Sequence, residues 1–300
     1  MKFLWLPREE IATDDETFRV RRRYPEPLRH SVTQHGVKTP LLVLPVGSGF
    51  QLVSGWGRYE FAPRDSALPA YVLPAQSQPE TVWERFLTDN DRWNVVEVAR
   101  VLDGLRSLDG MTDERIVREK LPLLGVRPAN DLYRGHLRLL ELPAVALEFI
   151  EQENLPLRRA SLFSKLPAGA LPAFVEHAVG LRWTLNEIAE VLELVAETAE
   201  REQVAADEIL RETCAGNEKA AALANLRERR YPELSRYQRE LAELTRELRF
   251  TVPVKIEWDR RLERPGIRLI ADLEDADALR TLRTEMEAQS DKLRGFFDIL

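Results

Sequence analysis

Residues 36–62, GVKTPLLVLPVGSGFQLVSGWGRYEFA, carry the pattern that decides the fold of the N-terminal part of the chain. The apolar run Leu41–Leu44 predicts a buried strand, the glycines at 47 and 49 predict a turn, and Phe50–Val53 predicts a second strand. That strand runs directly into Ser-Gly-Trp-Gly-Arg, which opens a helix. A strand, a glycine turn and a helix start bring backbone N–H groups and a positive helix end together. This arrangement suits an anion, usually a phosphate.

Arg58 stands where its guanidinium group could bind phosphate oxygens with two parallel hydrogen bonds. Gly55 and Gly57 are equally the ordinary chemistry of a tight strand–helix turn that binds nothing. Trp56, between them, either stacks on a base or packs in the core. The residues by themselves leave both alternatives open.

Three motifs resemble the N-terminal domain of the ParB/Spo0J/Noc partition proteins, also called the ParB-like nuclease domain. Gly36–Pro40 stands where that family has Gly-x-x-Gln-Pro. Gly55–Arg58, followed by Ala62, stands where the family has Gly-Glu-Arg-Arg. Asp89–Arg92 stands where the family has Glu-Asn-x-x-Arg. Sulfiredoxin and a free-serine kinase share the fold, but the glycine box here lacks the thiol that sulfiredoxin uses.

The resemblance implies a nucleoside triphosphate, often CTP, with Mg²⁺ as cofactors. The residues that it implies for the nucleotide are Gly36, Thr39, Pro40, Gly55, Trp56, Gly57 and Arg58, and those for the metal are Asp89 and Asn90. Trp56 replaces the acidic residue of the glycine box, and Gly57 replaces an arginine. Because hydrolysis needs stricter positioning than binding does, we expect nucleotide binding with weak or no hydrolysis.

The segment from Met111 to Pro143, with a turn at Gly125, is similar to the helix-turn-helix core of the same proteins. The resemblance implies DNA as a partner, contacted by Arg21, Arg22, Arg23, Arg127, Asn130, Arg134, His136 and Arg138. Residues 110–166 hold nine basic and eight acidic side chains, which gives only weak electrostatic support for tight duplex binding. The alternatives are a solvated helix face and an arginine loop paired with Asp14, Asp15 and Glu16.

We predict an α+β protein in four parts. These are a mixed α/β ParB-like N-terminal domain at 1–92, a helical domain with the helix-turn-helix at 93–200, a helical connector at 201–250, and a small ββα domain at 251–300. In the last part, Val252–Trp258 and Ile267–Ala271 read as strands. A final helix from Asp275 is expected to turn Leu279, Leu282 and Met286 inward.

The composition, with 44% apolar and 31% charged residues and a net charge of −7, is that of a globular protein. No apolar run approaches 18 residues, so we expect no membrane span, and the start MKFLWLPREE is not a secretory signal. Cys214 is the only cysteine, which excludes internal disulfides and multi-cysteine zinc sites. We expect a cytoplasmic homodimer, and the resemblance implies association with the nucleoid and a partition ATPase as a further partner.

Three functions from different classes remain open at this stage. The first is a DNA-associated partition or regulatory protein. The second is an enzyme on the same fold, a nuclease or a phosphotransferase, for which Glu60 is the candidate base. The third is an interaction scaffold that kept the fold and lost the ligand.

Overall fold

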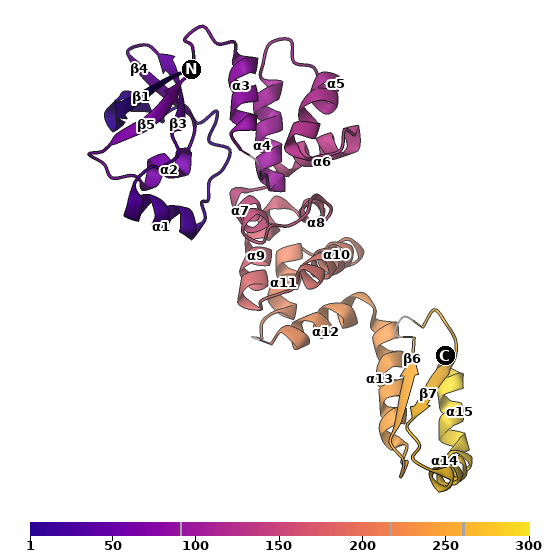
Figure 1. The fold of residues 1–300 in the computed structure, drawn as a ribbon. Coiled ribbons are helices and arrows are strands. Elements are labelled where there is room, and N and C mark those ends of the chain that lie inside the picture. The colour runs from indigo at the N-terminus through magenta and orange to yellow at the C-terminus, as the bar shows by residue number, and fades with distance from the viewer. Residues whose placement is uncertain (91, 217, 260–261) are drawn as a thin grey trace. The chain divides into compact units, whose positions relative to one another are not determined.

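A mixed sheet forms the N-terminal end of the chain (Figure 1). It has five strands in the order β1-β5-β3-β4-β2. The strands are β1 (Lys2–Pro7), β2 (Ile11–Ala12), β3 (Leu41–Val46), β4 (Gly49–Ser54) and β5 (Ala67–Val72). β3 and β4 are antiparallel neighbours, and β5 joins β3 in parallel and β1 antiparallel. The two strands predicted at 41–44 and 50–53 lie within β3 and β4, so that prediction is confirmed.

This computed structural model describes residues 1–90, 92–216, 218–259 and 262–300. The chain divides into two units, Met1–Val175 and Glu176–Leu300. The α+β class that the sequence predicts is confirmed. The boundaries of the four predicted parts stay a prediction.

The two faces of the sheet pack against different helices, because side chains alternate along a strand. Leu41, Val43 and Leu52 lie in one cluster with Val32 of α1 (Glu26–His35) and Trp56 of α2 (Trp56–Phe61). The opposite face, with Leu42 and Val53, packs in a second cluster. The sheet thereby holds α1 and α2 on one side, where the glycine turn lies.

The second cluster is continuous from the sheet into the helical segment that follows. It contains Leu42 and Val53 of the sheet, Trp83 of α3 (Pro79–Thr88), Leu102 of α4 (Val95–Arg106) and Tyr133 of α6 (Asn130–Leu139). The remaining elements of this part are α5 (Asp113–Arg115), a π-helical turn η2 (Ile116–Lys120), η3 (Leu121–Leu124), α7 (Ala144–Gln152), α8 (Leu157–Ala160), η4 (Ser161–Lys165) and η5 (Ala168–Ala170). Side chains on both sides of residue 92 therefore share one core.

Helices continue through the next stretch of the chain. They are α9 (Leu171–Gly180), α10 (Leu185–Glu202), α11 (Ala206–Thr213), α12 (Lys219–Arg230) and α13 (Pro232–Glu247). In the sequence, Thr184-x-x-Glu187 before an apolar run predicts a capping box. The box is present at the start of α10, because Thr184 accepts from the Glu187 N–H and the Glu187 side chain accepts from the Thr184 N–H. The apolar stripe that follows, which includes Ile188 and Val195, is buried.

The C-terminal strands β6 (Val254–Trp258) and β7 (Ile267–Ala271) pair antiparallel, and α14 (Ala276–Ala288) and α15 (Ser290–Ile299) follow them. Asp275 caps α14, as expected, by accepting from the Ala278 N–H. The expectation that α14 turns Leu279 inward is wrong, since that side chain is 55% exposed. The reason is that Leu241 and Leu248 pack with Phe296 of α15 and so fill the small core without α14.

Candidate functional site

The glycine turn begins at Gly55, whose φ of 97° places it in the left-handed region that favours glycine. A Cβ on Gly55 would also lie 2.6 Å from Leu41 Cδ2, so close packing and backbone conformation both require glycine here. Gly36 has a positive φ as well and ends α1. The turn delivers Trp56, Gly57 and Arg58 as the first residues of the short helix α2.

Arg58 connects all three predicted motifs. Its Nη1 donates to the carbonyl oxygens of Thr39 at 2.8 Å and Pro40 at 2.6 Å, both in the first motif. Its Nη2 lies 3.5 Å from Asp89 Oδ2 of the third motif. Burial lowers the pKa of the Arg58 guanidinium, and the Asp89 carboxylate acts in the opposite direction. Residues that are distant in sequence thus meet at one guanidinium group.

The two predicted metal ligands are engaged in contacts within the protein. Asp89 accepts a short hydrogen bond from the Ser54 hydroxyl through the same oxygen that faces Arg58. Asn90 donates through Nδ2 to the carbonyl oxygen of Phe86 at 2.7 Å. Asp91 lies outside the described residues. Within the described ranges, no three His, Cys, Asp or Glu side chains gather in a way that would hold a metal ion.

A cavity of about 150 Å³ lies beside the turn. Its walls are formed by Phe18, Arg21, Tyr24, Leu28, Ser54, Gly55, Trp56, Gly57, Arg58, Phe86, Asn90 and Trp93. Ligand pockets are usually about 300–1,000 Å³, so a triphosphate with its Mg²⁺ does not fit the present arrangement. The Trp56 indole is buried, and its Nε1 finds no hydrogen-bond partner among the described residues.

Gly57 leaves no room for the arginine that the partition family has at this place. A Cβ on Gly57 would lie 2.6 Å from Cδ1 of the Tyr24 ring and 2.9 Å from Leu28 Cδ2. Tyr24 is fixed in turn, because its hydroxyl donates to the carbonyl oxygen of Arg21 at 2.9 Å. An aromatic ring therefore fills the space beside residue 57.

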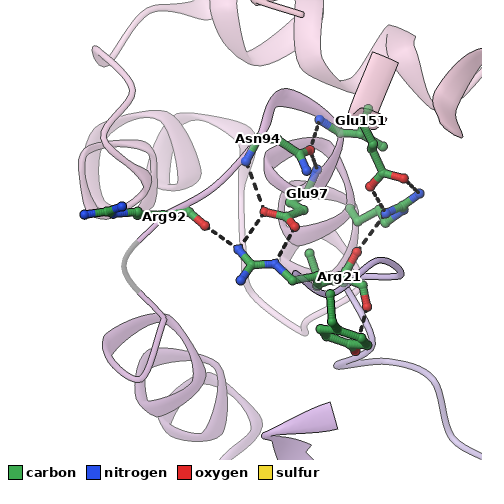
Figure 2. A network of polar contacts seen from close by, with 9 residues as sticks. Arg21, Arg92, Asn94, Glu97 and Glu151 are labelled. Atoms are coloured by element: carbon green, nitrogen blue, oxygen red, sulfur yellow. Dashed lines mark hydrogen bonds and ion pairs between the residues drawn. The ribbon is translucent and has the colours of Figure 1, made fainter. Parts of the chain in front are cut away.

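Arg21 belongs to a polar network that it shares with Glu97 and Asn94 (Figure 2). Its Nε donates to Glu97 Oε1 at 2.6 Å, and its Nη2 donates to Glu97 Oε2 at 3.1 Å and to the Arg92 carbonyl oxygen at 2.5 Å. The Glu97 side chain is only 4% exposed. Glu97 also accepts from the Asn94 N–H, while Asn94 Oδ1 accepts from the Val96 and Glu97 N–H groups, which completes a capping box at the start of α4.

A second ion pair extends this network to α7. Arg100 donates through Nη1 to Glu151 Oε1 at 2.6 Å and to the Val20 carbonyl oxygen at 2.8 Å, and Glu151 is 5% exposed at its side chain. The loop around Val20 is thereby held against α4 and α7 (Figure 2). The network is structural in character, since each carboxylate is matched to a guanidinium group.

The three arginines predicted to touch DNA at 21–23 have different surroundings. Arg21 faces Glu97, as described above. Arg22 is exposed, and its guanidinium lies 3.9 Å from Glu16. Arg23 donates to Gln152 at 2.9 Å on α7. Of the acidic partners that the sequence suggested for these arginines, Glu16 lies beside Arg22. Arg21 pairs instead with Glu97, which is 76 residues away in the sequence.

Helix α6 carries the other predicted DNA contacts. Asn130, Arg134 and Arg138 recur every fourth residue and are all exposed, and Arg127 is exposed just before the helix. His136 does not share this surface, because it is 3% exposed and its Nδ1 lies 2.7 Å from the Leu132 carbonyl oxygen. Burial lowers the pKa of His136. The expectation that His136 lies with Arg134 and Arg138 on one exposed face is therefore wrong.

Comparison with known proteins places this chain beside the partition proteins. The chromosome-partitioning protein Spo0J of Thermus thermophilus is 31% identical over 128 residues, which are 42% of this chain and 45% of that relative. Over the matched residues the chain is ParB-like in sequence. The match spans less than half of the relative's own length, and no family model matches the chain.

Two solved structures of ParB from Caulobacter crescentus, both truncated at the C-terminus, are also similar to the ParB-like chain. One, complexed with CTP-gamma-S, is 22% identical and has a TM-score of 0.25, covering 56% of this chain and 94% of that one. The other, complexed to the centromeric parS site, is 18% identical and has a TM-score of 0.35, covering 64% and 99%.

Sequence reasoning missed three residues of the ParB-like chain that organise the surroundings of the site. Glu97 and Glu151, whose side chains are nearly buried, pair with Arg21 and Arg100, and Lys120 is 5% exposed between Glu80 and Glu84 of α3. The spacing Asn94-x-x-Glu97 before an apolar run is the signal of a capping box and could have identified Glu97. No local sequence pattern identifies Glu151 or Lys120, because their partners are distant in sequence.

Proposed function

We propose that this ParB-like chain is a DNA-associated protein, acting in chromosome or plasmid partition or in a related regulatory role, and that α6 contacts the duplex. The observation that carries the proposal is the exposed row Asn130, Arg134 and Arg138 on a helix whose opposite side, with Tyr133 and Leu139, is buried. The similarity to the chromosome-partitioning protein Spo0J supports the same reading.

The chemistry of that row suits a duplex. Arginine can bind phosphate oxygens or the edge of guanine with two hydrogen bonds, and asparagine can do the same with adenine. The helix is held firmly, because the Tyr133 hydroxyl donates to Asp113 Oδ1 at 2.6 Å. A rigid helix loses little conformational freedom on binding, which favours its use as a recognition surface.

Fluorescence anisotropy with a labelled duplex at several salt concentrations tests the DNA part of the proposal. The double variant Arg134→Ala/Arg138→Ala should reduce the slope of log affinity against log salt by about 1.8, if each arginine neutralises one phosphate. The control Arg29→Ala/Arg64→Ala removes two exposed arginines from the sheet-bearing region and should leave the slope unchanged. Equal slopes for the wild type and the α6 variant would contradict the proposal.

We infer further that the glycine turn binds the phosphate of a nucleotide, CTP or another nucleoside triphosphate, with weak or no hydrolysis. Gly55, Arg58 and Asn90 line one cavity, and the first motif lies directly against Arg58. A thermal-shift panel of CTP, ATP and GTP, with and without Mg²⁺, tests this part. One nucleotide should raise the melting temperature, and Arg58→Ala should abolish the rise.

A ParB-like scaffold that has lost its ligand is the second candidate. It is favoured by the internal pairing of Arg58 with Asp89 and by the Tyr24 ring beside Gly57. In that case no nucleotide would shift the melting temperature, while DNA binding would persist. The phosphotransferase alternative has less support, because Glu60, its candidate base, is exposed and lies 3.5 Å from Arg19 rather than in the cavity wall.

A further inference from the structure

Two hydrogen-bond donors at the glycine turn face a carboxylate of the chain itself, that of Asp89. The Ser54 hydroxyl donates to Asp89 Oδ2, and Arg58 Nη2 lies 3.5 Å from the same oxygen. Ser54 and Arg58 both line the cavity of about 150 Å³, whereas Asp89 is not among its wall residues. One carboxylate oxygen thus faces both the Ser54 hydroxyl and Arg58 Nη2.

We propose that Asp89 is an internal counter-ion of Arg58, which an anionic ligand must displace, and that it is not a ligand of the metal. This inference rests on the proposed phosphate site at the glycine turn. A phosphate oxygen would take the place of Asp89 Oδ2 and accept from the same two donors, the Ser54 hydroxyl and Arg58 Nη2.

The geometry allows this exchange without moving the arginine. Arg58 is anchored through Nη1 to the carbonyl oxygens of Thr39 and Pro40, which leaves Nη2 as the nitrogen that changes its partner. Ser54 is 1% exposed, so its hydroxyl is fixed in place by packing. Donors held in this way need no reorganisation when the acceptor changes.

The electrostatics explain why the chain supplies a counter-ion of its own. The Arg58 side chain is 16% exposed, and a guanidinium group so far removed from water is costly without an opposing charge. Asp89 provides that charge from a position that is 38% exposed at its side chain and can move into solvent. While Asp89 is in place, its negative charge repels an incoming phosphate at the distance of a direct contact.

The substitution Asp89→Asn separates the two possible roles of this residue. If Asp89 is the counter-ion, the variant removes the competitor and binds polyphosphate more tightly, on the order of tenfold, without any metal. If Asp89 is a Mg²⁺ ligand, the variant loses the contribution of the metal and binds more weakly. The two roles predict changes of opposite sign.

Isothermal titration calorimetry of the full-length chain, with inorganic tripolyphosphate and with CTP, in EDTA and then in Mg²⁺, measures the difference. Asp89→Asn should tighten the binding of both ligands in EDTA. Adding Ser54→Ala to Asp89→Asn should remove part of the gain, because the hydroxyl is then missing as a donor. Asp65→Asn is the matched control: it removes one negative charge from an exposed loop and should change the affinity less than about twofold. Circular dichroism verifies that each variant is folded.

Unchanged or weaker binding by Asp89→Asn in EDTA would overturn the counter-ion proposal, and so would an equal gain in Asp65→Asn. Loss of a Mg²⁺-dependent increase in Asp89→Asn, without any gain in EDTA, would assign Asp89 to the metal instead. If neither the wild type nor Asp89→Asn binds either ligand, the counter-ion proposal fails together with the nucleotide site. The DNA part of the proposed function is judged separately by anisotropy and would be untouched.

Discussion

Gly57 shows how one residue determines what the glycine turn can contain. Because Gly57 has no side chain, the Tyr24 ring lies so close that a Cβ on residue 57 would be 2.6 Å from Cδ1 of the ring. From the sequence, Gly57 reads as turn chemistry or as a lost phosphate ligand. The structure adds a packing requirement, which no local pattern reveals, because Tyr24 is brought to Gly57 by the folding of α1 against α2.

The substitution Gly57→Ala should therefore destabilise the protein by about 1–3 kcal/mol, the usual cost of overpacking a tight contact. Urea unfolding followed by circular dichroism measures the change. Gly169→Ala is the matched control, because a Cβ there meets no atom within 4 Å among the described residues and its φ is not in the left-handed range. In a Tyr24→Ala background the cost of Gly57→Ala should fall, since the two residues are in contact. A cost that is the same in both backgrounds would show that the ring is not responsible.

Glu97 combines two stabilising roles in a single buried side chain. It pairs with Arg21 and it completes the capping box of α4 with Asn94. Glu97→Gln should cost about 1–3 kcal/mol of unfolding free energy, because the nearly buried side chain at this position then no longer gives Arg21 a charged hydrogen-bond partner. Glu153→Gln changes an exposed glutamate at the end of α7 and should cost less than about 0.5 kcal/mol. A similar small cost for Glu97→Gln would show that the pair is replaceable by water.

At the scale of elements, α3 is joined to the π-helical turn η2 by a cluster of charges. Lys120 donates to Glu80 at 2.8 Å and to Glu84 at 2.9 Å, and Arg115 also donates to Glu80 at 2.7 Å. The hydrogen bond from Lys120 is the largest influence that lowers the pKa of Glu80, and the positive charges of Lys120 and Arg115 act in the same direction. π-Helical turns are rare and often lie at functional sites. The turn η2 precedes α6 in the chain, and these ion pairs join it to α3.

The lowered pKa of Glu80 makes the stability of this contact dependent on pH. Because the folded-state pKa lies below the ordinary value of 4.5, the stabilisation is fully present above that value and is lost as the pH falls through the lowered pKa. Glu80→Gln should therefore be less stable than the wild type at neutral pH, and the difference should shrink as the pH falls below about 4.5. Urea midpoints measured across this range test the prediction. Glu114→Gln, at an exposed position, should show the same dependence of the urea midpoint on pH as the wild type. A difference in midpoint between Glu80→Gln and the wild type that stays constant with pH would contradict the role assigned to Glu80.

Elements with local signals were predictable, and contacts between distant elements were not. Alternating and apolar runs identified β3, β4 and β7, and Thr184-x-x-Glu187 identified the start of α10. The Arg21–Glu97 and Arg100–Glu151 pairs join residues 76 and 51 positions apart, so only the tertiary fold brings them together. The same limit applies to Asp89, whose type suggested a metal ligand and whose neighbours make it a partner of Ser54 and Arg58.

At the scale of the whole molecule, the net charge of −7 is spread over a chain in which many guanidinium groups are already paired with carboxylates of the protein itself. Arginine content alone therefore overstates the positive surface available to DNA. In the part of the chain that the structure describes, no helix is both long and apolar enough to span a membrane.

The C-terminal unit carries an apolar groove of about 800 Å³ between α14 and α15. Its apolar walls are formed by Leu279, Leu282, Met286, Leu293 and Phe297. Leu279 and Phe297 are 55% and 59% exposed, and contiguous apolar surface of this kind marks a site of association. The sequence predicted α14 to turn its leucines inward, but the core is already filled by α13 and α15. We therefore expect a second copy of the chain to bury them.

Sedimentation velocity over a range of protein concentrations tests whether this groove holds the expected homodimer together. The wild type should sediment as a dimer, and Leu279→Asp/Phe297→Asp should sediment as a monomer, because two charges would have to be buried in an apolar interface. Val179→Asp is the matched control: it places a charge at another apolar side chain that is 55% exposed, on α9, and should leave the dimer intact. Dissociation by the control would indicate a general effect of charge. A wild type that stays monomeric at every concentration would mean that the groove serves a different partner, and the same groove variant would then identify that partner by loss of its binding.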